Sequence, residues 1–134
     1  MSMTFAWLLT AALAISSVGW ALRARHVRRL ADTSDEVFAD YFRTHGDVNA
    51  TAALVERKEI AKLLRIPLTK LGPQTSIPEL LSPLDPTMRV GLGDLEFDMM
   101  RLAKKARLSD CHVPSNIGEL IKLRVDLKAK ATRG

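Results

Sequence analysis

Cysteine is almost absent from this 134-residue chain, which contains only Cys111. A single cysteine excludes an internal disulfide framework and suits a reducing compartment. The neighbouring His112 has no second Cys or His at ligand spacing, since His26 and His45 lie far away in the sequence. Because a structural zinc site needs a set of such ligands at short spacing, we expect no metal site.

Charge is absent from the first 22 residues, although the whole chain carries a net charge of +5. Residues 3–22 supply about the 20 apolar residues with which a helix crosses the hydrocarbon core of a bilayer. Trp7 and Trp20 lie near the two ends of this run, where amphipathic rings prefer the headgroup region. A cleaved signal peptide is the alternative, but no positive charge precedes the run and no clean small-residue site follows it. We therefore predict a transmembrane anchor over residues 1–22.

Basic residues appear for the first time directly after the apolar run, and none precedes it. By the positive-inside rule, this asymmetry places the rest of the chain in the cytoplasm, as a single-pass protein of the cell's inner (plasma) membrane. The same side chains can bind anionic lipid, at about 1 kcal/mol per basic residue near the surface, but topology alone accounts for them. At the membrane interface we expect Trp7, Trp20, Arg23, Arg25, Arg28 and Arg29.

The alternation of polar and apolar residues that is typical of strands is also absent, and the chain after the arginines has helical periodicity. We expect an all-α protein in which an N-terminal transmembrane helix precedes a small helical bundle. Residues 23–48 form a juxtamembrane basic segment and an amphipathic helix in this interpretation. The bundle covers residues 49–127, and residues 128–134 form a basic tail.

Two helices are expected before residue 65. The first begins with a capping box formed by Thr33 and Glu36 and ends at Gly46. Its aromatic stripe most often indicates a face packed on a core, with docking of a partner as the alternative: Val37, Phe38, Tyr41 and Phe42. The second helix, over residues 49–64, buries its apolar stripe and turns its charged residues mostly outward: Glu56, Arg57, Lys58, Glu59 and Lys62.

Neither a catalytic constellation nor a nucleic-acid-binding motif is present. A helix-turn-helix would have to place its recognition helix near Leu68, but Gly72 and Pro73 stop that helix after about one turn. No glycine-rich phosphate loop occurs, since "VGLGDLEF" has the wrong spacing. We expect no enzyme and no nucleic-acid partner. We place the carboxylates on exposed helix faces, paired with neighbours three or four residues away: Glu56, Glu59, Asp94 and Asp98.

Three segments resemble the acyl carrier protein family in their order and spacing. "RIPLTKLGPQTSIPELL" (residues 65–81) resembles the end of the family's first helix and its long first loop, and "LGDLEFDMMRLAKKARL" (residues 92–108) resembles its second helix. "HVPSNIGELIKLRV" (residues 112–125) resembles its last helix, with Asn116 as the capping residue. The resemblance implies a helical bundle over residues 50–125 and a phosphopantetheine group on a serine at the start of the second helix.

That serine is missing, because Glu96 stands at the attachment position and a carboxylate cannot accept the modification. Ser82 is a minority candidate, but Pro83 follows it and the family's Asp-Ser-Leu order is not reproduced. We expect residues 82–91 to be an irregular loop insertion and the second helix to begin at the Leu-Gly-Asp turn that precedes residue 95. A degenerate carrier domain without a cofactor follows from this interpretation.

The second departure from the family is the charge of the second helix, which is typically acidic there and docks on basic patches of partner enzymes. Here we expect acidic residues in its first turn and basic residues after it, an arrangement that the helix dipole explains. A docking surface of reversed sign, for an acidic partner, explains it equally well. Leu95, Met99, Leu102 and Ala106 would bury the opposite face. The acidic residues are Asp94, Glu96 and Asp98, and the candidate partner-binding residues are Arg101, Lys104, Lys105 and Arg107.

From these features we expect a non-catalytic, membrane-anchored adaptor or accessory subunit with an acyl-carrier-like domain. It would bind a partner enzyme or complex, with an acidic docking surface, at the cytoplasmic face of the membrane. One alternative is a functional, membrane-tethered carrier of an acyl or aminoacyl group. Another is a small subunit of a membrane complex that is bound mainly through its transmembrane helix.

Overall fold

The computed structural model describes residues 2–45, 48–80, 86–109 and 112–133. Within these residues it contains six α-helices, a short 3-10 helix and no strand. The expected all-α class is therefore confirmed. The elements are α1 (Ser2–Arg29), α2 (Asp35–His45), α3 (Ala50–Leu64), the 3-10 helix η1 (Leu68–Lys70), α4 (Ile77–Leu80), α5 (Pro86–Lys105) and α6 (Ile117–Arg133).

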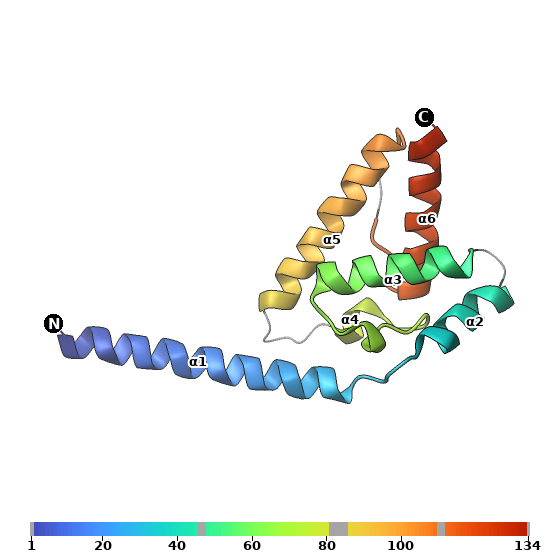
Figure 1. Ribbon diagram of the computed structural model, residues 1–134. Coiled ribbons are helices and arrows are strands. Elements are labelled where there is room, and N and C mark those ends of the chain that lie inside the picture. The colour runs from blue at the N-terminus through green and yellow to red at the C-terminus, as the bar shows by residue number, and fades with distance from the viewer. Residues whose placement is uncertain (1, 46–47, 81–85, 110–111, 134) are drawn as a thin grey trace.

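The first helix projects away from a bundle that the other helices form (Figure 1). Among the described residues, α1 is the one helix long and apolar enough to cross a membrane, with a mean hydropathy of 1.7 in its most apolar part. None of that part is buried inside the protein. The helix also continues through the arginines to Arg29, so the basic segment forms its last two turns.

The bundle is organised around α3, which packs against α2, α5 and α6, while α5 also packs against α6 (Figure 1). On α2, Phe38 and Phe42 are fully buried. Their burial confirms the core-facing stripe, and the alternative in which these two rings dock a partner is wrong. Val37 lies outside this stripe, since it is 60% exposed. Other large core residues come from α3, α5 and α6, and the segment between α3 and α5 adds four more. They include Ile60, Leu64, Ile66, Leu71, Ile77, Leu80, Leu95, Met99, Ile117, Leu120 and Ile121.

The expected start of the second carrier-like helix is wrong, because α5 begins at Pro86 and passes through the region predicted to be an irregular loop. Proline suits the first position of a helix, where its missing N–H group is not needed. Gly91 has a packing role: a Cβ atom there would lie 2.8 Å from the carbonyl oxygen of Leu63. The glycine therefore permits close approach of α5 to α3. Ser82 lies outside the described residues.

The last helix begins where the sequence predicts. The side-chain oxygen of Asn116 accepts hydrogen bonds from the backbone N–H groups of Gly118 (2.8 Å) and Glu119 (3.3 Å). The Gly118 N–H also donates to the carbonyl of Pro73, at 2.9 Å, which joins the start of α6 to the loop before α4. At its other end α6 extends to Arg133, so most of the expected basic tail is helical.

Two glycines on α5 allow a matched test of this packing. Gly91→Ala should lower the free energy of unfolding by about 1–3 kcal/mol, because the new methyl group meets backbone atoms of α3 that cannot move independently. Gly93→Ala meets nothing within 4 Å and should raise it by about 0.5–1 kcal/mol through helix propensity. Denaturation of the full-length protein in detergent measures both, and a stabilising Gly91→Ala would contradict the close α3–α5 approach.

Candidate docking surface on α5

A buried arginine of α6 gathers carboxylates from α3 and α5. Arg124 of α6 is 1% exposed and donates three hydrogen bonds of 2.8 Å to carboxylates. Its Nε atom binds Glu56, and its two Nη atoms bind Glu59 and Asp98. The expected pairing of these carboxylates along their own helices is therefore wrong, apart from the 2.6 Å contact between Asp98 and Arg101.

Lys128, one turn after Arg124, completes this ion-pair cluster. Its Nζ atom lies 2.5 Å from Glu56 and 2.7 Å from Glu59. Three carboxylates thus meet three cations, Arg124, Lys128 and Arg101, and the charges balance. The carboxylates are occupied by strong donors, which does not favour a role in general acid–base chemistry.

The pKa values in the cluster follow from this geometry. Burial raises the pKa of Asp98, but the hydrogen bonds and charges of Arg124 and Arg101 outweigh burial and lower it below its usual value. The pKa of Glu59 is lowered in the same way, against burial, by Lys128 and Arg124. Burial also works against the charged form of Lys128, yet Glu56 and Glu59 raise its pKa. Asp98, Glu59 and Lys128 are therefore charged at neutral pH.

A second buried arginine, Arg57, connects α3 to the segment before α2. Its Nε donates to the carbonyl of Leu71 (2.9 Å), and its Nη atoms donate to Asp35 (2.7 Å) and to the carbonyl of Thr33. The guanidinium also lies over the ring of Phe38, 4.5 Å from its centroid. The expectation that Glu56 and Arg57 point outward is wrong. Their spacing from the buried residues Ala53, Ile60 and Ala61 places them on the same helix face.

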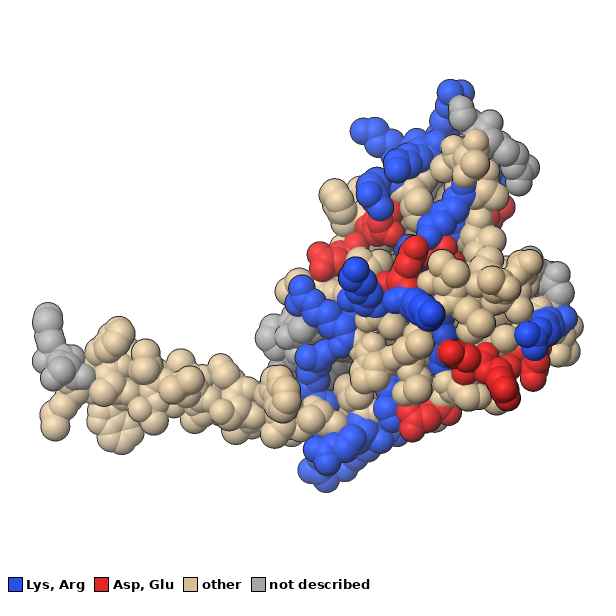
Figure 2. Space-filling model, in the orientation of Figure 1, with Lys and Arg blue, Asp and Glu red and all other residues tan. Residues whose placement is uncertain are grey.

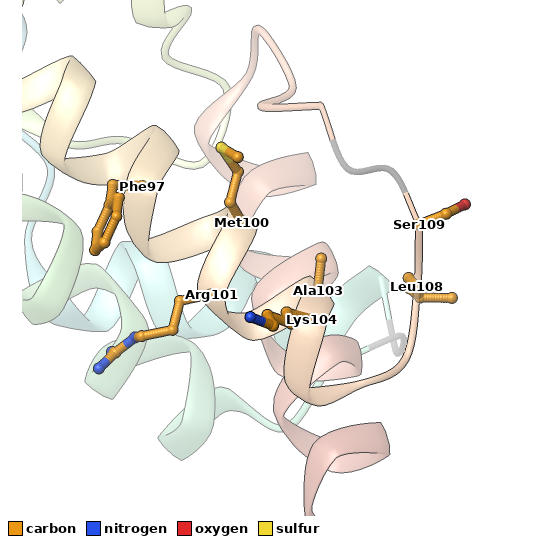
Figure 3. Close-up of a pocket in the computed structure, with 7 residues that line it drawn as sticks. All are labelled: Phe97, Met100, Arg101, Ala103, Lys104, Leu108 and Ser109. Atoms are coloured by element: carbon orange, nitrogen blue, oxygen red, sulfur yellow. The ribbon is translucent and has the colours of Figure 1, made fainter.

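The outer face of α5 carries apolar side chains that the protein leaves exposed. Phe97 is 70% exposed and Met100 is 64% exposed, and Leu108 follows the helix at 41%. Together with basic side chains they line a shallow groove of about 590 Å³ (Figure 3). We call this the α5 groove, and its residues are Phe97, Met100, Arg101, Ala103, Lys104, Leu108 and Ser109.

Helical spacing explains why these residues share a face. Phe97, Met100 and Lys104 lie three and four residues apart, opposite the buried side of α5. After Lys105 the chain reverses through Arg107, which has a left-handed backbone (φ 61°). The N–H of Arg107 donates to the carbonyl of Lys104, and that of Leu108 to the carbonyl of Ala103, which is the Schellman pattern. This turn brings Leu108 and Ser109 to the groove.

The basic residues predicted to bind a partner fall into two groups. Arg101 forms the ion pair with Asp98, whereas Lys104, Lys105 and Arg107 have no ion pair with any residue that the structure describes. These three residues are exposed at the C-terminal end of α5, where positive charge interacts favourably with the helix dipole.

The dipole does not explain the acidic residues of α5. The first turn of α5 contains no acidic residue, and both Asp94 and Glu96 lie exposed in the middle of the helix. The buried face of Leu95, Met99 and Leu102 is confirmed. The apolar members of the groove are the part of the site that sequence reasoning missed. Their common face could have been found by projecting residues 97, 100 and 104 onto a helix.

Arg124 should be among the least replaceable residues of the bundle. Arg124→Gln leaves Glu56, Glu59 and Asp98 without their shared partner and should lower the free energy of unfolding by about 3–5 kcal/mol. Lys130→Gln, on the same helix, removes an exposed pair with Asp126 and should cost at most about 1 kcal/mol. Thermal and denaturant unfolding measure both, and equal effects would contradict the buried cluster.

The cluster also predicts loss of stability in acid. Since the pKa values of Asp98 and Glu59 lie below the ordinary 3.8 and 4.5, their contribution is complete above those values. It is lost as the pH falls through the lowered folded-state values. We expect a steep decrease in the free energy of unfolding below about pH 4, measured by denaturation across the acid range. Asp98→Asn should reduce the slope, whereas the exposed Asp126→Asn should retain it.

Comparison of the chain with protein-family models, with curated proteins and with solved structures finds no significant match. The features of the molecule that point to a function are therefore α1, the ion-pair cluster and the α5 groove.

Proposed function

We propose that this protein is a non-catalytic, membrane-anchored adaptor or accessory subunit. In this proposal α1 lies in the inner (plasma) membrane, the bundle is the cytoplasmic platform, and the α5 groove binds a partner protein. The exposure of Phe97 and Met100 is the observation that carries the proposal. Contiguous exposed apolar side chains rimmed by polar residues are typical of interaction sites.

The charge around the groove defines the partner's chemistry. Lys104 and Arg101 line the groove, and Lys105 and Arg107 lie beside it at the end of α5. An acidic surface on the partner complements these cations, which accelerate association and set its orientation. An amphipathic helix with acidic flanks fits this description, because its apolar side chains can cover Phe97 and Met100.

The carrier alternative has less support. A carrier needs a hydroxyl group at the start of the helix that the resemblance equates with α5. Glu96 is a carboxylate in the middle of α5, ten residues after the helix begins at Pro86. The adaptor proposal keeps what the resemblance implies about docking, since the second helix is the family's usual docking element, and it requires no prosthetic group.

Site-specific photo-crosslinking tests the proposal in the native membrane. A photoreactive residue at Phe97 should capture a protein partner, because the partner covers this side chain. The same residue at Val37, which is 60% exposed on α2, should capture none. The yield of the crosslinked product at position 97 should decrease as the salt concentration rises, since salt screens the charges around the groove.

Charge reversal then identifies the contacts. Lys104→Glu with Lys105→Glu should weaken capture at least about tenfold while leaving thermal stability close to wild type. Lys58→Glu with Lys62→Glu makes the same charge change on the exposed side of α3 and should leave capture unchanged. If the partner is still bound after charge reversal on α5, and crosslinks to residues of α1 instead, the result would favour the alternative of a subunit bound by its transmembrane helix.

A further inference from the structure

The C-terminal end of α1 is attached to the bundle at several points. Arg23 donates a hydrogen bond to the backbone carbonyl of Arg65, at the end of α3. The Nε2 atom of His26 lies 2.9 Å from the carbonyl oxygen of Glu79, at α4. Lys70 of η1 binds the carbonyl of Leu30 (2.9 Å) and the carboxylate of Asp32 (3.0 Å) just after α1. These contacts give the bundle one orientation relative to α1.

In this orientation one edge of the bundle faces the apolar part of α1. Figure 1 shows the C-terminal end of α3 and the N-terminal end of α5 at this edge, and α6 on the far side of α5. In Figure 2, Lys and Arg side chains gather along the same edge and around the end of α1, whereas the projecting part of α1 carries no charge. With α1 in a bilayer, this edge faces the lipid headgroups.

Arg65 stands at this edge in an unusual backbone conformation. It ends α3 with a left-handed backbone (φ 57°, ψ 43°), a conformation that glycine adopts at lower cost. The Arg65 side chain is exposed, so this position carries a cation in spite of the energetic cost of the backbone conformation. The residue lies beside the end of α1, because Arg23 donates its hydrogen bond to the Arg65 carbonyl. The presence of arginine, and not glycine, in this strained backbone conformation suggests that the charge of Arg65 has a function.

Three further arginines lie at the same end of α1, on the face opposite Arg23 and its contact with Arg65. Arg25, Arg28 and Arg29 are exposed and form no ion pair with an acidic residue in the described part of the chain. Together with Arg65 they make a set that we call the arginine collar. The contact of Arg23 with Arg65 places Arg65 on one side of the end of α1, and the other three arginines lie on the opposite side.

We propose that the arginine collar binds the phosphate groups of anionic membrane lipids and thereby holds the bundle against the bilayer. Planar guanidinium groups match phosphate oxygens in pairs. Lipids are the source of phosphate because the anchor places the collar at the headgroup level, where lipid phosphates are concentrated. The inference rests on the proposed role of α1 as the anchor, and it is independent of the α5 groove.

Lipid retention by the full-length chain tests this inference. In dodecyl maltoside micelles, native mass spectrometry should show dioleoyl phosphatidylglycerol retained more tightly than dioleoyl phosphatidylcholine. Each cation near the surface contributes about fivefold in affinity. Combined Arg25→Gln, Arg28→Gln and Arg65→Gln substitutions should therefore reduce the preference at least about tenfold. The matched loss of three cations from α5, by Lys104→Gln, Lys105→Gln and Arg107→Gln, should leave it unchanged.

Arg65→Gly separates lipid binding from folding. Glycine relieves the left-handed strain, so the variant should unfold at a higher temperature and still lose about fivefold of the lipid preference. Excess glycerol 3-phosphate should not displace the lipid, because a soluble phosphate lacks the anchoring membrane.

Several results would overturn the inference. These are equal retention of the two lipids, equal losses in the collar and α5 variants, or displacement of the lipid by the soluble phosphate. Carbonate extraction of membranes reports on the anchor separately. A chain that stays in the membrane without any lipid preference refutes the collar alone, whereas a chain that is released refutes the proposed function as well.

Discussion

The buried guanidinium of Arg124 is the constraint around which the bundle is built. It receives carboxylates from two other helices, Glu56 and Glu59 from α3 and Asp98 from α5. Removing such charges from water costs several kcal/mol per ion, and the cost is recovered only when every partner is in place. Only one register of α3, α5 and α6 satisfies all of these contacts at once. The apolar core around them then packs in that register.

The cluster also determines which charges remain for interactions with other molecules. The carboxylates of α3 and α5 that bind Arg124 are neutralised within the bundle, whereas Lys104, Lys105 and Arg107 have no acidic partner in the described residues. Phe97 and Met100 are on the side of α5 away from the core. A surface that is both apolar and basic therefore remains on one helix, and this combination is the basis of the proposed adaptor role.

An arginine in a left-handed turn lies at each of the two proposed binding sites. Arg65 closes α3 beside the end of α1, and Arg107 closes α5 beside the groove. In each turn the backbone satisfies the last carbonyls of a helix while the side chain is exposed to solvent. Local helix termination and surface charge are thus joined in the same residues.

The amino-acid sequence alone determined the all-α class, the apolar α1, the Asn116 cap and the buried face of α5. These features depend on local periodicity and capping, which neighbouring residues decide. Only the tertiary structure decided that Glu56 and Arg57 are buried, because their partners lie on α6, on α2 and in the loops before α2 and α4. It also decided that α5 begins at Pro86, since the close contact of Gly91 with α3 has no local signature. The exposure of Phe97 likewise depends on which faces of α5 the bundle covers.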